Sequence, residues 1–335
     1  MQYKFEDIAI NSTAKKKPTE EDKDTYIGLE HLDSDCLYVT RWGADAAPTG
    51  EKLLMKKGDV LFGKRRAYQR KVGIAPFDGI FSAHGMVLRP NEEIIDKDFF
   101  PFFISSDQFM ERAVRISVGG LSPTINWKDL RVQEFILPSI EEQRILADKL
   151  WAAYRLKESY KKLLTATQEM VKSQFIEMFD FEDLTLSNPS NSFSEKCYDD
   201  TSSATKVAAS DYQKSGRYAI YDQSQDCNIA GYTDSEEGLC DNYPAVLFGD
   251  HSRVVKYINQ PFYIGADGVK IIRPKEEDLL PEFLYYDLLY HNIPNTGYNR
   301  HFKYVKMLRL TKATIDKQKQ FLQIAHQADK SEYYN

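Results

Sequence analysis

The chain has 335 residues, of which 42% are hydrophobic and 28% are charged, so it has room for two domains and a connecting segment. Its formal net charge of -6 and its pI of about 5.7 argue against a protein that binds nucleic acid through overall charge, because such binding needs clustered Lys and Arg. Any basic surface that binds a polyanion must therefore be local.

The sequence shows no pattern typical of a secretory signal or a membrane span. Residues Met1–Asp7 lack a basic segment followed by an apolar one, and no apolar run approaches the roughly 18 residues that a bilayer requires. The mean hydropathy is -0.51. We expect a soluble, cytoplasmic protein whose cysteines are reduced thiols, because they are few and lack zinc-ligand spacing: Cys36, Cys197, Cys227 and Cys240.

The first basic segment follows a short strand predicted at Asp59–Phe62. Between Lys56 and Lys71, seven Lys or Arg residues accompany a single acidic residue. Gly63 ends the strand, so residues 64–71 are expected to form a projecting loop that reaches phosphates and base edges. The alternative is a solvated basic loop without a partner. The predicted DNA-binding residues here are Lys64, Arg65, Arg66, Tyr68, Gln69, Arg70 and Lys71.

A faint internal repeat relates residues 58–146 to residues 244–321. Each copy has Leu-Phe-Gly, then a short strand closed by Arg-Pro, an aromatic segment expected to be a helix, a Gly-containing loop and an Ile-x-x-Gln element. The five features keep their order, which predicts two domains with helices packed on a sheet. The Leu-Phe-Gly segments are Leu61–Gly63 and Leu247–Gly249, the loops are Gly119–Pro123 and Thr296–Arg300, and the last elements are Ile140–Gln143 and Ile315–Gln318.

A long helix is predicted between the two copies. Ser139 can cap it, Glu141 and Glu142 suit its first turn, and no Gly or Pro follows until Pro189. Apolar residues recur mostly at three- and four-residue steps, which gives one apolar stripe. At about 1.5 Å per residue, some forty residues make a rod roughly 60 Å long. We expect this rod to lie against a partner helix.

The second copy carries its basic residues later than the first. Aromatic and basic residues interleave from Tyr298 to Lys312, as on many nucleic-acid surfaces, although Phe302 and Val305 also suit a core. A polar loop follows Leu247–Gly249 at the position of Lys64–Arg66. The predicted DNA-binding residues of this copy are His251, Arg253, Tyr298, Asn299, Arg300, His301 and Lys303.

Local motifs of common catalytic sites are absent from the sequence. It has no phosphate loop ending in Gly-Lys-Ser or Gly-Lys-Thr, no Gly-x-Gly-x-x-Gly, no His-Glu-x-x-His, no Gly-x-Ser-x-Gly and no Asn-Pro-Pro-Tyr or Asp-Pro-Pro-Tyr. His291, Asn292 and His301 could be imagined as nuclease ligands, but isolated His residues are more often structural. We therefore predict a non-catalytic protein without catalytic, cofactor-binding or metal-ligating residues.

At these residues the sequence resembles the specificity subunits of type I restriction-modification systems. The first copy is similar to one class of their target recognition domains and the second copy to another. The resemblance rests on Tyr26–Leu32, Gly58–Lys64, Ser122–Trp127 and Leu137–Gln143 in the first copy, and on Phe248–His251, Gly265–Lys270 and Gly297–Phe302 in the second.

The resemblance implies an α+β fold in which two mixed α/β target recognition domains each read half of a split DNA site. Long conserved helices would join them as an antiparallel coiled coil, although the second helix is shorter here than is usual in the family. The implied segments are residues 1–138 (first target recognition domain), 139–180 (long spacer helix), 181–205 (linker), 206–313 (second target recognition domain) and 314–335 (second, shortened helix).

The resemblance also implies the partners of the chain. They are double-stranded DNA, two methyltransferase subunits and restriction subunits, and no membrane. The whole complex would use S-adenosylmethionine, ATP and Mg, none of them bound by this chain. The bases recognised and the spacer length do not follow from the sequence.

Other functions stay open at this stage. One is the specificity partner of a related defence system with a fused methyltransferase-nuclease, which the identity of the co-purifying protein would reveal. Another is a DNA nuclease or methyltransferase in its own right, which activity of the chain alone would establish. A purely structural coiled-coil protein would not need two globular copies.

Overall fold

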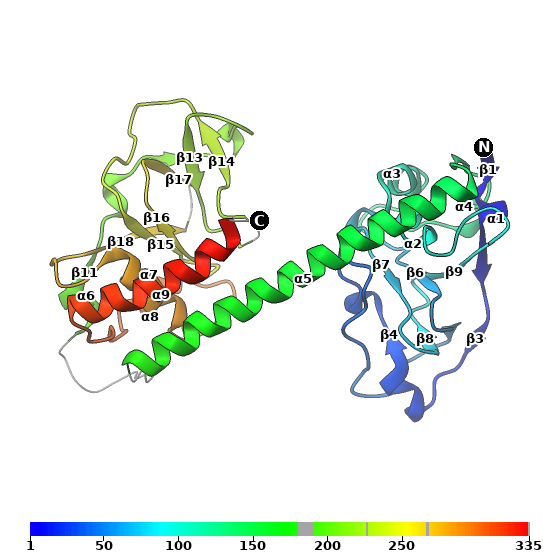
Figure 1. Ribbon diagram of the computed structural model, residues 1–335, viewed down its shortest axis with the longest axis horizontal. Helices are drawn as coiled ribbons and strands as arrows, with labels where there is room; N and C mark the ends of the chain where they lie inside the picture. The colour runs from blue at the N-terminus through cyan, green and yellow to red at the C-terminus, as the bar shows by residue number, and fades with distance from the viewer. Residues whose placement is uncertain (180–190, 226, 266–267, 334–335) are drawn as a thin grey trace. The chain divides into compact units, whose positions relative to one another are not determined.

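The computed structural model describes residues 1–179, 191–225, 227–265 and 268–333. The chain divides into two compact units, Met1–Ser159 (unit 1) and Tyr160–Asn335 (unit 2), and helix α5 (Ile140–Phe179) contributes to both (Figure 1). The fold is α+β, as predicted. None of the helices in the described ranges combines the length and the apolar character that a bilayer span requires.

Unit 1 contains two four-stranded sheets. The first has the antiparallel order β2 (Ala9–Ser12), β9 (Met86–Pro90), β6 (Val60–Phe62) and β7 (Val72–Ile74). The second has the order β3 (Lys15–Lys16), β5 (Lys52–Met55), β8 (Gly79–Phe81) and β4 (Tyr26–Ile27), with β4 parallel to β8. Strand β1 (Gln2–Lys4) pairs with β10 (Glu134–Ile136), and the helices are α1 (Phe5–Ile8), α2 (Phe100–Ser105), α3 (Asp107–Arg115) and α4 (Trp127–Leu130).

Unit 2 also contains two four-stranded sheets. The first has the antiparallel order β11 (Cys197–Asp199), β18 (Val269–Pro274), β15 (Ala245–Gly249) and β16 (Val255–Ile258). The second has the order β12 (Lys206–Val207), β17 (Phe262–Gly265), β13 (Tyr218–Tyr221) and β14 (Gly231–Thr233), with β12 and β13 parallel to β17. The helices are α6 (Phe193–Lys196), α7 (Pro281–Tyr290), α8 (Phe302–Val305) and α9 (Ile315–Tyr333).

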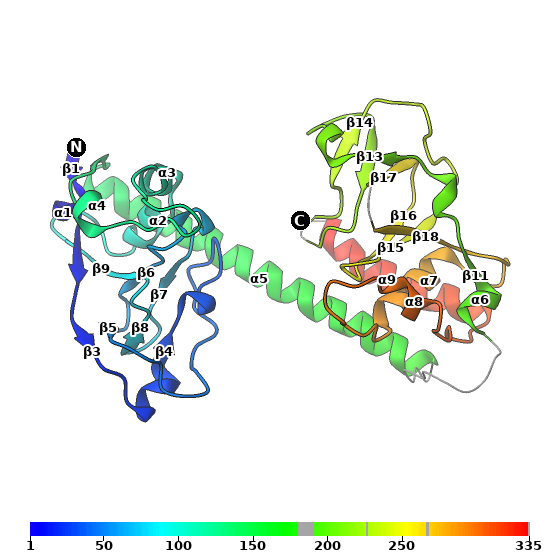
Figure 2. The same ribbon diagram turned by 180° about the vertical axis from the view of Figure 1, so that it is seen from behind.

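Alternating side chains on one strand explain why each unit has three layers. In β15, Val246 and Phe248 face the core beneath helices α7 and α9, whereas Leu247 belongs to the core between the two sheets. Since successive strand residues point to opposite faces, a fully apolar strand of this length is a central layer. Figures 1 and 2 agree that α7 and α9 lie on one side of the β11-β18-β15-β16 sheet and β13, β14 and β17 on the other. Unit 1 repeats the pattern with Phe62 toward the helices and Leu61 toward the second sheet.

The predicted internal repeat is confirmed by the topology of the first sheet in each unit. Strands β2, β9, β6 and β7 correspond in order and direction to β11, β18, β15 and β16. The Leu-Phe-Gly segments lie at the ends of β6 and β15, and the Arg-Pro segments end β9 and β18.

The Ile-x-x-Gln element makes the same contacts in both units. Gln143 accepts a hydrogen bond from the Asp96 amide at 2.8 Å and donates to two backbone carbonyls, those of Ile94 at 3.1 Å and Pro138 at 3.0 Å. Gln318 accepts from the Leu280 amide and donates to two carbonyls at 2.9, 2.8 and 3.0 Å. Both side chains are 1% exposed, so each holds the loop before α2 or α7 against the start of a long helix.

Helix α5 has 40 residues, Ile140–Phe179, close to the predicted bounds. Ser139 and Glu142 form a reciprocal cap, in which the Ser139 amide donates to the Glu142 carboxylate at 2.9 Å and the Glu142 amide donates to the Ser139 hydroxyl at 3.3 Å. In unit 2, the ring of Phe175 lies 5.1 Å from that of Phe321 on α9, which has only 19 residues. A coiled coil along the whole of α5 stays a prediction.

The predicted linker, residues 181–205, needs a correction on its C-terminal side. Residues 180–190 lie outside the described residues, but α6 and β11 follow directly, and β11 pairs with β18. Phe193 is buried in α6 as Phe5 is in α1, and the Phe193 amide donates to Leu308 just as the Phe5 amide donates to Gln133. Elements of three or four residues are too short to show a hydrophobic periodicity, so this part of the sequence has the polar, aperiodic pattern of a linker.

Candidate nucleic-acid interface

In unit 1 the loop after β6 joins a second loop that is distant in sequence. Residues 118–124 form a small hairpin in which Val118 and Thr124 exchange backbone hydrogen bonds of 3.0 and 2.9 Å. Arg65 pairs with Thr124 as an antiparallel bridge, and the Arg66 amide donates to the Pro123 carbonyl at 2.7 Å. We call residues 64–66 together with residues 118–124 the first platform.

Two arginines and one tyrosine present their side chains beside this platform. Arg65 is exposed and makes no hydrogen bond or ion pair within the described part of the chain. Arg66 donates through Nε to the Ser122 hydroxyl at 3.1 Å and has a φ of +56°, a conformation uncommon for residues other than glycine. Tyr68 is 55% exposed. These three predicted residues are exposed, and their contact with DNA stays a prediction.

The remaining predicted residues of the first loop serve the fold of unit 1. Arg70 lies 2.8 Å from Asp35 and 2.9 Å from Asp107, and the hydrogen bond that its guanidinium donates to Asp35 raises the pKa of that guanidinium. Lys71 donates to the Leu29 carbonyl at 2.6 Å. Both cations thus bind groups of unit 1 itself, and DNA contact from Arg70 and Lys71 stays a prediction.

Lys64 and Gln69 are half-buried. Burial, and then the charge of Lys15, lowers the pKa of Lys64. The Gln69 carbonyl accepts a hydrogen bond from the Ser34 hydroxyl at 2.6 Å. DNA contact by these two residues stays a prediction. Both are less exposed than Arg65.

Unit 2 builds a second platform at the equivalent place, after β15. The carboxylate of Asp250 accepts from the Phe302 amide at 2.7 Å, and its carbonyl accepts from the His301 amide at 2.8 Å. The His251 ring stacks on the Tyr298 ring, with centroids 4.8 Å apart and planes at 9°. We call residues 250–253 together with residues 296–302 the second platform.

His301, which was predicted to contact DNA, has a side chain that is 0% exposed. Its contact with DNA stays a prediction. The Thr296 amide faces Nε2 of His301 at 3.3 Å, and the Asp250 carbonyl faces Nδ1 at 3.0 Å. An amide N–H can only donate, so Nε2 accepts and Nδ1 carries the proton. His301 therefore holds the two segments of the second platform together.

The other predicted residues of unit 2 divide into anchored and exposed side chains. Arg253 has a φ of +64° and donates to the Ile293 carbonyl at 2.9 Å, and the Asn299 amide group donates to the Thr296 carbonyl. Arg300 and Lys303 are exposed, and the Lys303 ammonium lies 4.9 Å from the centre of the Tyr304 ring. Ala266 and Asp267 in the family-like segment Gly265–Lys270 lie outside the described residues.

Sequence reasoning missed Leu121, whose side chain is 97% exposed in the hairpin of the first platform. The corresponding loop of unit 2 carries Tyr298, which is 89% exposed and was predicted. The available signal was the repeat itself, which aligns Gly119–Pro123 with Thr296–Arg300.

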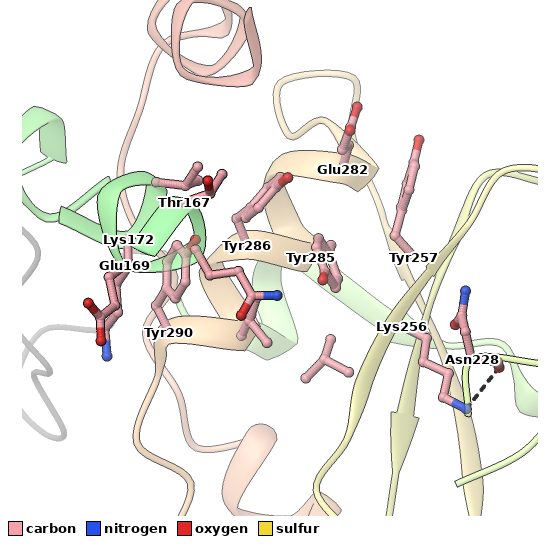
Figure 3. Close-up of a pocket in the computed structure, with 14 residues that line it drawn as sticks. Thr167, Glu169, Lys172, Asn228, Lys256, Tyr257, Glu282, Tyr285, Tyr286 and Tyr290 are labelled. Atoms are coloured by element: carbon pink, nitrogen blue, oxygen red, sulfur yellow. Dashed lines mark hydrogen bonds between the residues drawn. The ribbon is translucent and has the colours of Figure 1, made fainter. Parts of the chain in front are cut away.

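A pocket of about 660 Å³ lies elsewhere on unit 2, between the end of α5, α7 and β16 (Figure 3). Four tyrosines line it together with Lys256, whose ammonium donates to the carbonyls of Cys227 and Asn228 at 3.0 Å each. None of the predicted DNA-binding residues lines this pocket. Within the described ranges, no three His, Cys, Asp or Glu side chains gather in a way that could hold a metal ion.

Comparison with known proteins identifies what the first unit resembles. The family model described as "Type I restriction modification DNA specificity domain" matches residues 3–166. No curated protein matches the chain significantly. Among solved structures, the S subunit of a type I restriction-modification system from M. genitalium is 13% identical, with a TM-score of 0.56 over 99% of this chain and 89% of that chain. The HsdS subunit from Thermoanaerobacter tengcongensis is 17% identical, with a TM-score of 0.38 over 99% of this chain and 89% of that chain. The likeness to the M. genitalium subunit shows a shared fold.

Proposed function

Because this chain belongs, through residues 3–166, to the type I restriction-modification DNA specificity family, we propose that it is the non-catalytic specificity subunit of such a complex. It reads a bipartite, asymmetric DNA site, with one half bound by each unit. The first and second platforms are the surfaces that meet the DNA.

The observation that carries this proposal is the repeated topology. Unit 1 holds most of the match to the DNA specificity domain, and unit 2 repeats the order and direction of its first sheet. Both units then place a loop after the central strand against a Gly-containing loop further along the chain. Two copies of one reading surface, with different side chains, suit a site with two different halves.

The proposal includes the partners of the complex. Two methyltransferase subunits bind the chain, restriction subunits join them, and the complex works in the cytoplasm on double-stranded DNA. S-adenosylmethionine, ATP and Mg belong to those partner subunits. The exposed apolar side chains of α5, such as Leu163 at 50% exposure, support a helix that has a protein partner in the assembled complex.

The test is to express the chain with the methyltransferase subunit encoded beside it and to map the methylated bases in the host DNA. We expect one split motif of two unequal halves around an unread spacer. A contiguous motif, or methylation that does not depend on this chain, would contradict the proposal. The purified chain alone should neither methylate nor cut DNA.

A further inference from the structure

The two most exposed large hydrophobic side chains of the described residues lie in the corresponding Gly-containing loops of the two platforms. Leu121 is 97% exposed and Tyr298 is 89% exposed, whereas the next most exposed such side chain is the N-terminal Met1 at 79%. An isolated exposed apolar residue on a soluble domain is ordinary. One such residue in each of the two corresponding loops is a feature that the two copies share.

Both side chains stand on loops that project from the surface. Gly119 has a φ of +113° and Gly297 a φ of +78°, so the loops turn sharply two residues before Leu121 and one residue before Tyr298. A Cβ atom added at Gly120 or Gly297 would meet nothing within 4 Å, so the space beside these two glycines is open.

The loops are anchored at their bases. On the first platform, Arg66 binds both Ser122 and Pro123, the two residues that follow Leu121. On the second, His251 stacks on Tyr298 and its Nδ1 lies 3.2 Å from the Asn299 carbonyl. Because these contacts already hold the loops, less conformational entropy remains to be lost when the loops bind.

The charge beside both tips is positive. Arg65 is exposed on the first platform, and Arg300 and Lys303 are exposed on the second. A protein or lipid partner would favour a continuous apolar patch, whereas Leu121 is flanked by Gly120 and Ser122. One apolar side chain on a platform that also exposes cations fits a DNA groove, because phosphates flank the base edges there and the thymine methyl is the apolar group of the major groove.

We propose that Leu121 and Tyr298 are the equivalent specificity-determining tips of the two units, each making an apolar contact with a thymine methyl in the major groove. This inference rests on the proposed function and assigns to it two residues, one for each half of the site. Leu121 reads an A·T pair in the half bound by unit 1, and Tyr298 reads one in the half bound by unit 2.

The experiment uses the chain in complex with its methyltransferase subunits and a duplex that carries the mapped site. We expect Leu121→Ala to weaken binding about tenfold and to relax one A·T position in one half only, and Tyr298→Ala to do the same in the other half. Replacing the thymine at the affected position by deoxyuridine should weaken binding of the unsubstituted complex by a similar factor. It should have no effect on the complex with the matching alanine variant.

Two control variants match the tips in residue class and lie on strands away from the platforms. Ile136→Ala on β10 removes a side chain that is 68% exposed, and Tyr198→Ala on β11 removes one that is 40% exposed. Both should keep the affinity and the motif. Thermal unfolding of Leu121→Ala and Tyr298→Ala should be unchanged, since neither side chain is buried.

The outcomes separate this inference from the proposed function. If the unsubstituted complex gives no split motif, the proposed function fails first. If it gives a split motif that Leu121→Ala and Tyr298→Ala leave unchanged, the tip assignment is overturned. The assignment is also overturned if the variants weaken binding to all sequences equally, or if deoxyuridine weakens binding of the alanine variants as much as that of the unsubstituted complex.

Discussion

Units 1 and 2 place an arginine at the same point of the fold but pair it with different carboxylates. Arg89 ends β9 and binds Asp59, which precedes β6, at 2.7 and 2.9 Å. Arg273 ends β18 and binds Asp200, which follows β11, and donates to the Pro244 carbonyl at 3.0 Å. The alternation of apolar residues is common to both units, so it is the apolar pattern that sets the shared layers. The charge partner can come from either neighbouring segment.

The second sheets of the two units differ more. Strands β8 and β17 both have a parallel neighbour on one side, β4 and β12. On the other side, β8 has the antiparallel β5, whereas β17 has the parallel β13. The repeat is therefore tight around the sheet that supports the platforms and loose in the sheet behind it. This pattern is expected if the platforms carry the function.

The largest expected effect tests the two arginines against each other. In the first pair, the Arg89 side chain is 36% exposed and that of Asp59 is 6% exposed; in the second, Arg273 is 5% exposed and Asp200 is 17% exposed. Arg273 is itself buried and also donates to the carbonyls of Pro244 and Asn242, so Arg273→Ala leaves these groups as well as Asp200 without their partner and should cost about 3–5 kcal/mol in unit 2. Arg89→Ala should cost about 1–2 kcal/mol in unit 1.

Hydrogen exchange followed by mass spectrometry can measure this difference, because it reports opening free energies for β18 and β9 separately. Arg217→Ala is the control, since it removes an exposed ion pair with Glu236 and should cost less than about 0.5 kcal/mol. Equal losses from Arg273→Ala and Arg89→Ala would mean that burial does not decide the strength of these pairs.

The second expected effect tests the feature that the units share most closely. Gln143→Ala and Gln318→Ala each remove three hydrogen bonds from a buried side chain and leave a backbone amide without its partner. Each should cost about 2–3 kcal/mol. The helix-surface variant Gln168→Ala should stay within about 0.5 kcal/mol of the unsubstituted chain. If the losses of hydrogen-exchange protection from Gln143→Ala and Gln318→Ala differ by more than about 1 kcal/mol, the two units share the geometry of this contact but not its contribution to stability.

The sequence predicted the parts of this structure that depend on local pattern. Helix α5 was predicted from uninterrupted helical spacing, and the strands that end in Leu-Phe-Gly were predicted from their apolar runs and following turns. Residues 192–203 were assigned to a linker because their helix and strand are too short to show a hydrophobic periodicity. Their burial depends on pairing with residues far along the chain, such as Leu308 with Phe193.

The site was predicted in part, for a related reason. The cluster of seven Lys and Arg residues between Lys56 and Lys71 predicted the first of the two segments that form the first platform. This cluster could not show that Asp35 and Asp107 neutralise Arg70, because Asp35 lies 35 residues away and Asp107 lies further along the chain. His301 looked like a surface residue beside Arg300, and only tertiary contacts to Asp250 and Thr296 bury it.

The smallest expected effect separates phosphate contacts from structural cations. Arg65→Ala removes an exposed guanidinium and should reduce the slope of log K against log salt concentration by about 0.9, which corresponds to one phosphate. Arg300→Ala should give the same change from unit 2. Lys97→Ala and Lys214→Ala remove exposed cations away from the platforms and should leave the slope unchanged.

Arg70→Ala should lower the stability of unit 1, since it breaks the contacts with Asp35 and Asp107. Binding of the mapped duplex across a salt series measures all five variants. An unchanged slope for Arg65→Ala together with a shallower one for Arg70→Ala would reverse the assignment of these two arginines, and the first platform would then meet DNA through the side of the loop nearer α3.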